Sequence, residues 1–167
     1  MKAHLDRLFS FPNPVNEVSA RLVAGGVVLL AMATIVSGQL WITALIAYGF
    51  VARVLTGPTL SPLGLLVTKV ITPRLTVAPR WVPGPPKRFA QGIGALVSTT
   101  AAVLALGLQL DGAAYGLLGL LVAAATLEAV FAFCVACSAF GFLMRVGLVP
   151  KAVCERCSDI HAEPAHP

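Results

Sequence analysis

From Leu22 to Ala52 the chain runs for 31 residues without a charged side chain, and no other feature constrains the fold as strongly. A helix needs about 20 residues to cross the hydrocarbon core of a bilayer, so this run is too long for one span. The turn-forming cluster Ser37-Gly38-Gln39 interrupts it. We therefore predict a helical hairpin, with one span over about residues 15–36 and a second over about residues 40–55. Asn13-Pro14 is the expected helix start.

Two further apolar runs follow in the second half of the chain. The first covers residues 89–110, and a tight turn at Asp111-Gly112 separates it from a run over residues 113–144 that holds one charge, Glu128. At ~1.5 Å per residue the second run would reach about 48 Å as one helix, longer than the hydrocarbon core. We expect its span to cover about residues 113–140, with the last turns leaving the bilayer.

These runs predict an all-α, four-span bundle over residues 13–146, with polar tails at 1–12 and 147–167. Charged residues make up only 11% of the chain, against about 25% in soluble domains, and the mean hydropathy is +0.87. The net charge of +5 does not indicate nucleic-acid binding, because the basic residues flank apolar runs and form no stripe with aromatics. The N-terminus lacks a cleavage pattern, so we expect no removable signal peptide.

The segment between the second and third spans indicates the topology. Residues 53–88 carry six basic side chains and no acidic one. Positively charged loops stay inside, so this segment and both termini are expected in the cytoplasm. Ser61-Pro62 begins a helix over about residues 62–72, too short to span and expected to lie on the membrane surface. The prolines of residues 76–86 predict irregular structure. Arg21 and Arg53 are expected to snorkel to the interface.

All four cysteines fall in two identical pairs, and three interpretations remain open. Cys134, Cys137, Cys154 and Cys157 have the spacing C-x₂-C-x₁₆-C-x₂-C, which can hold zinc or an iron–sulfur cluster. Two such pairs can also pass electrons or sulfur by thiol–disulfide exchange. In the third interpretation the four are unrelated packing residues and surface thiols.

Of the three interpretations we favour thiol–disulfide exchange. On one continuous helix, Cys134 and Cys137 would lie too far apart for an easy disulfide, because helix neighbours have Cβ atoms ~5–6 Å apart and a disulfide needs ~3.8 Å. A bridge between the pairs, or within Cys154–Cys157, is easier. Lys151 and Arg156 would favour a thiolate at the second pair.

Glu128 is the one acid within a predicted span, which makes it a functional candidate for proton transfer or cation binding. The structural alternative is a packing acid held by Arg53, Gln91 or the backbone. On a single helix Glu128 would point away from Cys137, which disfavours a shared site on one face. A transporter that uses Glu128 is a third possible function, and four short spans would then require a homo-oligomer.

The chain resembles the bacterial membrane family catalogued as domain of unknown function 4395 over about residues 12–160. The motifs that carry the resemblance are Asn13-Pro-Val-Asn-Glu-Val-Ser-Ala-Arg21, Gly57-Pro-Thr-Leu-Ser-Pro-Leu-Gly64, Thr72-Pro-Arg74, Pro86-Lys-Arg-Phe-Ala-Gln-Gly92, Leu127-Glu128 and the two cysteine pairs. The resemblance implies a small multi-span protein of the bacterial inner membrane with recurrent cysteines and a membrane glutamate. It also implies thioredoxin-like or rhodanese-like partners. We therefore expect one cytoplasm-facing thiol site, with a metal site lacking turnover as the alternative.

Overall fold

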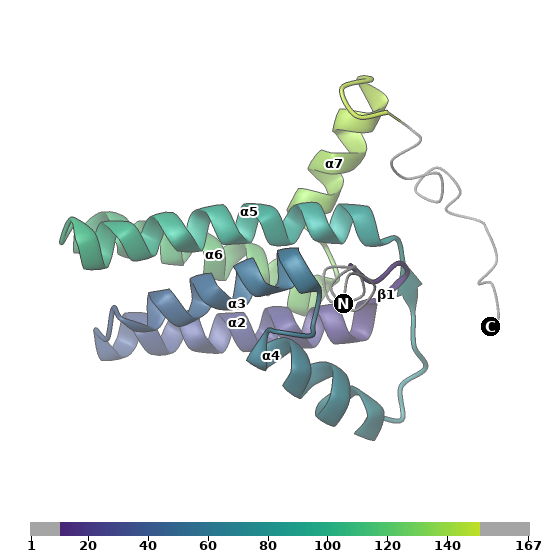
Figure 1. Cartoon of the computed structure of the whole chain (residues 1–167), viewed down its shortest axis with the longest axis horizontal. Helices are drawn as coiled ribbons and strands as arrows, with labels where there is room; N and C mark the ends of the chain where they lie inside the picture. Colours follow the sequence, from purple (N-terminus) through teal and green to yellow (C-terminus); the bar gives the residue numbers. More distant parts are fainter. Residues whose placement is uncertain (1–10, 151–167) are drawn as a thin grey trace, which may run out of the picture.

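A computed structural model of the chain describes residues 11–150, so Cys154 and Cys157 lie outside the described residues. Four helices run side by side along the length of the molecule (Figure 1). They are α2 (Glu17–Ser37), α3 (Ile42–Thr56), α5 (Gly84–Ala102) and α6 (Asp111–Phe131), and α5 continues into the π-helical turn η3 (Val103–Gly107). The mostly helical fold that the sequence predicts is therefore confirmed for the described residues.

The four helices form a closed ring, in which α3 packs on α5, α5 on α6, α6 on α2 and α2 on α3. Small and branched apolar side chains fill its centre: Ala24, Val27, Ala31, Ile46, Phe50, Leu118, Leu121 and Ala125. Close approach of α3 and α5 depends on Gly94, because a Cβ there would lie 2.2 Å from Cε1 of Phe50. The glycine thus makes room for an aromatic ring at the centre of the bundle.

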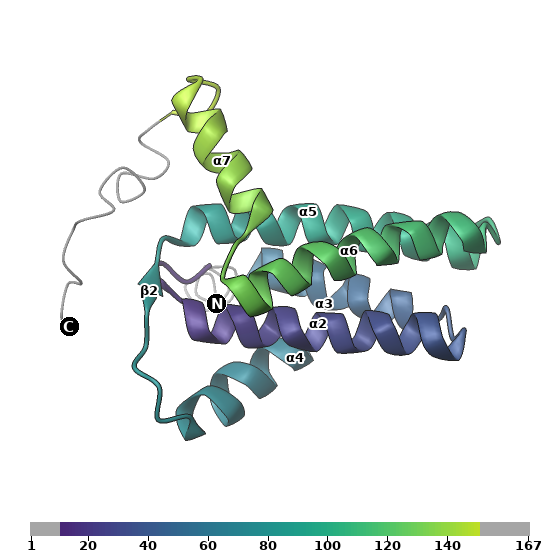
Figure 2. The same ribbon diagram turned by 180° about the vertical axis from the view of Figure 1, so that it is seen from behind.

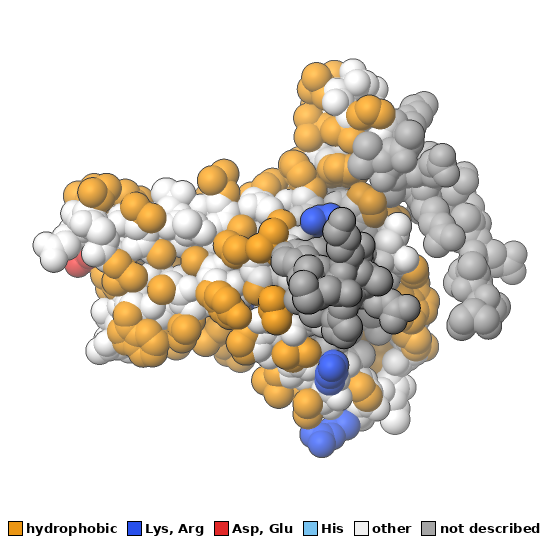
Figure 3. Space-filling model, in the orientation of Figure 1, with side chains coloured by type: hydrophobic (Ala, Val, Ile, Leu, Met, Phe, Trp, Pro, Cys, Tyr) orange, Lys and Arg blue, Asp and Glu red, His pale blue; other side chains and the backbone are white. Residues whose placement is uncertain are grey.

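Three of the helices are long and apolar enough to cross a membrane, namely α2, the α5–η3 unit and α6. At 15 residues α3 is shorter, so the structure does not by itself confirm the fourth span. Large apolar side chains point outward along the bundle, among them Leu29, Leu96 and Leu120, and Figure 3 shows apolar surface over its whole visible length. Apolar surface of this extent, on helices of this length, indicates a membrane protein.

The start of α2 differs from the sequence prediction. Its N-cap is Asn16, whose Oδ1 accepts a hydrogen bond from the Val18 amide at 3.0 Å. Asn13 instead accepts from the Gly84 amide at 3.1 Å, at the beginning of α5. A two-residue ladder between β1 (Val15–Asn16) and β2 (Trp81–Val82) holds the two helix starts together. Both asparagines are good caps, and only the tertiary pairing decides which helix each one serves.

The segment that follows α3 is helical, as predicted for residues 62–72. It consists of α4 (Pro62–Leu65), the π-helical turn η1 (Leu66–Ile71) and the 3₁₀ turn η2 (Thr72–Arg74). Ser61 caps it, since its hydroxyl accepts from the Gly64 amide at 3.2 Å. The segment leaves the bundle at an angle on the side away from α5 (Figure 1).

The fourth apolar run, expected as one span over residues 113–140, is two helices. Helix α6 ends at Phe131, and α7 (Val135–Arg145) begins four residues later and projects away from the bundle axis (Figure 2). Ala132 adopts the left-handed conformation with φ 56°, and its amide bonds to the Leu127 carbonyl to close the end of α6. This helix stop has no glycine, which is why the sequence pattern does not reveal it.

Candidate functional site

The first cysteine pair lies at the beginning of α7. Cys134 is the N-cap residue in an extended conformation, with φ −94° and ψ 104°, and Cys137 is in the first turn. The Cys134 Sγ accepts a hydrogen bond from the Cys137 amide at 3.4 Å. The prediction that both cysteines lie on one continuous helix is therefore wrong. Only one of them is helical, so the geometric objection to a disulfide between them no longer applies.

The two thiols have different acidities. A hydrogen bond from the Cys137 thiol lowers the pKa of Cys134, and both the Cys137 amide and the nearby Lys87 ammonium also act in this direction. The same thiol–thiol hydrogen bond, together with burial, raises the pKa of Cys137 above its usual value. Both side chains are half-buried and neither is oxidised. Cys134 is therefore the more acidic thiol of the pair and Cys137 the less acidic one.

A buried ion pair lies beside the thiols. The Lys87 Nζ of α5 and the Glu128 Oε1 of α6 are 2.7 Å apart, and their side chains are 10% and 15% exposed. Both groups are close enough to the cysteines to influence the thiol pKa values. The sequence argument that Glu128 points away from the pair assumed one continuous helix, and this premise is wrong, because α6 ends at Phe131 and α7 begins at Val135.

Sequence reasoning missed Lys87, which it placed in a solvated basic loop. Helix α5 begins at Gly84, five residues before the predicted start, and this brings Lys87 into the packed interior. The signal was present in Pro85-Pro86, because prolines are favoured in the first turn of a helix and not only in loops. The partner of Glu128 is thus Lys87, where the packing interpretation named Arg53 or Gln91.

Arg53 is buried, not snorkelled to the surface. Its side chain is 6% exposed; Nε donates to Gln91 Oε1 at 2.8 Å and Nη1 donates to Ser61 Oγ at 3.1 Å. The guanidinium also stacks 4.5 Å from the centre of the Phe50 ring. Arg21 reaches the end of α6, where it donates to the carbonyls of Ala129 and Val130 at 3.0 and 2.9 Å. A cation there suits the partial negative charge of a helix C-terminus.

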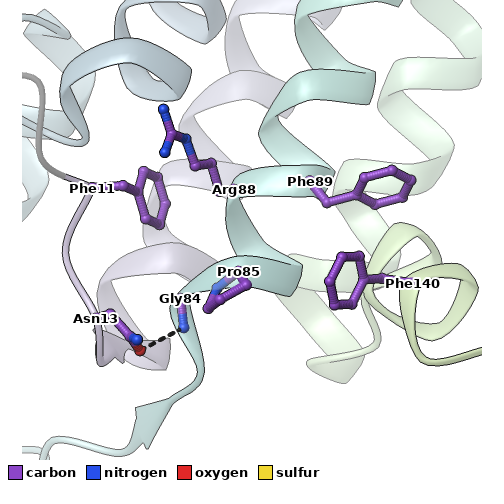
Figure 4. Close-up of a pocket in the computed structure, with 7 residues that line it drawn as sticks. All are labelled: Phe11, Asn13, Gly84, Pro85, Arg88, Phe89 and Phe140. Carbon is purple, nitrogen blue, oxygen red and sulfur yellow. Dashed lines mark hydrogen bonds between the residues drawn. The ribbon is translucent and has the colours of Figure 1, made fainter. Parts of the chain in front are cut away.

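An open cavity of about 470 Å³ lies where α7 meets the start of α5 (Figure 4). Phe89 and Phe140 stand on one side of α5 with ring centres 5.5 Å apart, and Phe11 and Arg88 stand on the other. Phe140 is three residues after Cys137 on α7, so this aromatic surface begins one helical turn from the thiols. It provides apolar contact area beside the cysteine pair.

The chain matches the family described as Domain of unknown function (DUF4395) over residues 15–145. The chain belongs to this family. No curated protein and no solved structure matches it. In this DUF4395 protein the matched region includes Glu128, Lys87 and the pair Cys134–Cys137, and it ends before Cys154. The family assignment made from the sequence motifs is therefore confirmed.

The predicted metal site needs all four cysteines of this DUF4395 protein. Within residues 11–150, no cluster of three or more His, Cys, Asp or Glu side chains could hold a metal ion. Because Cys154 and Cys157 fall outside the described range, zinc or iron–sulfur binding by the complete set stays a prediction. The arrangement that the described residues bring together is Cys134, Cys137, Lys87 and Glu128.

Proposed function

We propose that this protein is a four-span membrane dithiol that exchanges disulfides with a soluble cytoplasmic partner through Cys134 and Cys137. The observation that supports this most is the position of the pair: an N-cap cysteine that accepts from the amide of a first-turn cysteine. Helix N-termini and C-x-x-C spacing are the environments in which cysteine pKa values fall. The raised pKa of Cys137 then keeps a proton on the second thiol until it is needed.

The exchange has two balanced steps. The Cys134 thiolate attacks one sulfur of a partner disulfide, forms a mixed disulfide and displaces a partner thiolate, which takes up a proton. Cys137 then loses its proton and attacks the Cys134 sulfur, which forms the Cys134–Cys137 disulfide and releases the partner as a dithiol. Two electrons pass to the partner, which takes up two protons, one released by Cys137 and one from solvent, and the reverse sequence regenerates the membrane dithiol. The partner in this proposal is a thioredoxin-like protein, whose disulfide supplies the sulfur that Cys134 attacks.

Lys87 and Glu128 adjust the acidity of the pair. The Lys87 ammonium favours the thiolate and the Glu128 carboxylate opposes it, so the two groups together limit the net shift. Glu128 is also proposed as the group that accepts the proton Cys137 must lose in the second step, since its carboxylate is near enough to act on the Cys137 pKa. The pair Cys154–Cys157 is proposed as the second couple, which passes electrons between Cys134–Cys137 and the cytoplasm.

A redox titration of a Cys154→Ser/Cys157→Ser variant tests the proposal. The purified variant is equilibrated with mixtures of reduced and oxidised dithiothreitol, and free thiols are counted by mass after alkylation. We expect both remaining thiols to disappear together with a single midpoint and a mass loss of two hydrogens. Two thiols that stay alkylatable in excess oxidised reagent would contradict a redox-active pair.

The single variants Cys137→Ser and Cys134→Ser, in the same background, give the matched control. In Cys137→Ser the resolving thiol is gone, so we expect Cys134 to remain in a mixed disulfide and to trap a partner protein from cytoplasmic extract. In Cys134→Ser we expect little trapping, because Cys137 is the less acidic thiol. Stoichiometric zinc or iron in the wild-type protein that is lost on Cys154→Ser would instead support the metal site and overturn the exchange proposal.

A further inference from the structure

A second cavity, separate from the thiols, lies between α2, α3 and the start of α4. It encloses about 170 Å³. Its polar wall consists of Arg53 and Ser61, and its apolar wall includes Val27, Leu30, Ile46 and Leu63. A cavity of this kind, apolar with a few convergent polar groups, is the usual form of a small-molecule site.

The cation at the polar wall, Arg53, forms no salt bridge with any of residues 11–150. Arg53 contacts a neutral amide, a neutral hydroxyl and an aromatic ring, whereas the equally buried Lys87 contacts a carboxylate. The hydrogen bonds within residues 11–150 use Nε and Nη1 of Arg53, and Nη2, which makes none there, is not a buried atom. An arginine that is 6% exposed and forms no salt bridge within these residues is costly to bury, and a bound anion would offset that cost.

The apolar wall opens toward the outside of the bundle. Leu45 and Tyr48 line the same cavity and are about half exposed, at 52% and 54%. Tyr48 is held at the rim because its hydroxyl donates to the Leu60 carbonyl at 3.2 Å. A ligand can therefore place a polar group on Arg53 and extend an apolar chain past this rim along the outer face of α3.

We propose that this cavity binds the anionic headgroup of a membrane lipid, with the phosphate on Arg53 and Ser61 and the first carbons of the tail against Val27, Leu30 and Ile46. Arginine presents a planar set of donors that suits phosphate oxygens, and its free Nη2 is available for this contact. Arg53 lies one turn before the end of α3, close to the level where headgroups meet a helix of this bundle. The occupant is thus an anionic phospholipid from the surrounding leaflet.

Thermal unfolding of the purified full chain in a neutral detergent tests the proposal. Phosphatidylglycerol is compared with phosphatidylcholine and with inorganic phosphate, each added in excess. We expect phosphatidylglycerol to raise the Tm of the wild type by about 3–6 °C beyond the other two additions. An equal rise with phosphatidylcholine would contradict recognition of the anion, and an equal rise with inorganic phosphate would contradict use of the tail.

Two substitutions at Gly49 separate ligand binding from folding, because Arg53→Gln removes a buried group and can fail to fold. A Cβ at Gly49 would lie 3.4 Å from Nη1 of Arg53, an ordinary contact, so Gly49→Ala leaves most of the cavity open. Gly49→Leu puts a large apolar side chain into the cavity without removing the arginine from the chain. We expect Gly49→Ala to keep the phosphatidylglycerol effect and Gly49→Leu to lose it.

Lys69 is an exposed cation on η1 near the same end of the bundle, and Lys69→Gln is the matched charge control. We expect Lys69→Gln to retain the phosphatidylglycerol-specific rise and Arg53→Gln, where it folds, to lose it. Retention of the full rise in both Gly49→Leu and Arg53→Gln would overturn the assignment of the cavity.

Discussion

The two ends of the bundle are built very differently. At one end, the turns after α2 and after η3 place a single charged residue, Asp111, among the described side chains. At the other end lie the buried cations Arg53 and Lys87, the acid Glu128 and the cysteine pair. Both ends close the same four helices, but only one of them does so with buried charge. The concentration of buried charge at one end indicates where function lies.

The largest expected effect comes from breaking the buried ion pair. In Glu128→Gln the Lys87 ammonium, 10% exposed, keeps its charge but loses its partner, which we expect to cost ~3–5 kcal/mol in the free energy of unfolding. Unfolding of the purified variant in detergent measures this cost.

The double variant Lys87→Met/Glu128→Gln provides the control for that measurement. It removes both charges, so most of the lost free energy of unfolding should return. A double variant as unstable as the sum of the two single variants would show that the charges do not interact, contrary to the 2.7 Å contact.

A smaller effect on the free energy of unfolding is expected at Ala132, where α6 ends and the chain leads into the cysteine pair. Ala132 has φ 56°, a conformation that glycine adopts with little strain, so Ala132→Gly should stabilise the protein by ~0.5–1 kcal/mol. Ala139 lies in the regular part of α7, and there the same substitution should destabilise by ~0.5–1 kcal/mol. Equilibrium unfolding compares the two; effects of the same sign would be inconsistent with the left-handed turn.

The smallest effect is expected at the opposite end of the bundle. Asp111 is in the first turn of α6, where a negative charge interacts favourably with the helix dipole. Replacement by asparagine should lower the free energy of unfolding by only ~0.3–1 kcal/mol, a value reduced further in high salt. A loss comparable to that of Glu128→Gln would remove the contrast between the two ends.

The helices of the bundle could be predicted from the sequence because long apolar runs and turn clusters act locally. The site could not, because its parts depend on where helices begin and end. Lys87 enters the interior only because α5 begins at Gly84, and Cys134 becomes a cap only because α6 stops at Ala132. The inward turn of Arg53 depends on Gln91 and Ser61, which are distant in sequence. Tertiary contacts of this kind leave no periodic signal in the chain.

The pH dependence of Cys134 alkylation tests the central claim most directly. In a Cys154→Ser/Cys157→Ser background, Cys137→Ser keeps a hydroxyl that can donate to the Cys134 sulfur, whereas Cys137→Ala removes the side-chain donor. Because this hydrogen bond is the main cause of the lowered pKa, we predict that Cys134 reacts at lower pH in Cys137→Ser than in Cys137→Ala. Identical alkylation profiles in the two variants, both at the pH of an ordinary thiol, would contradict the account.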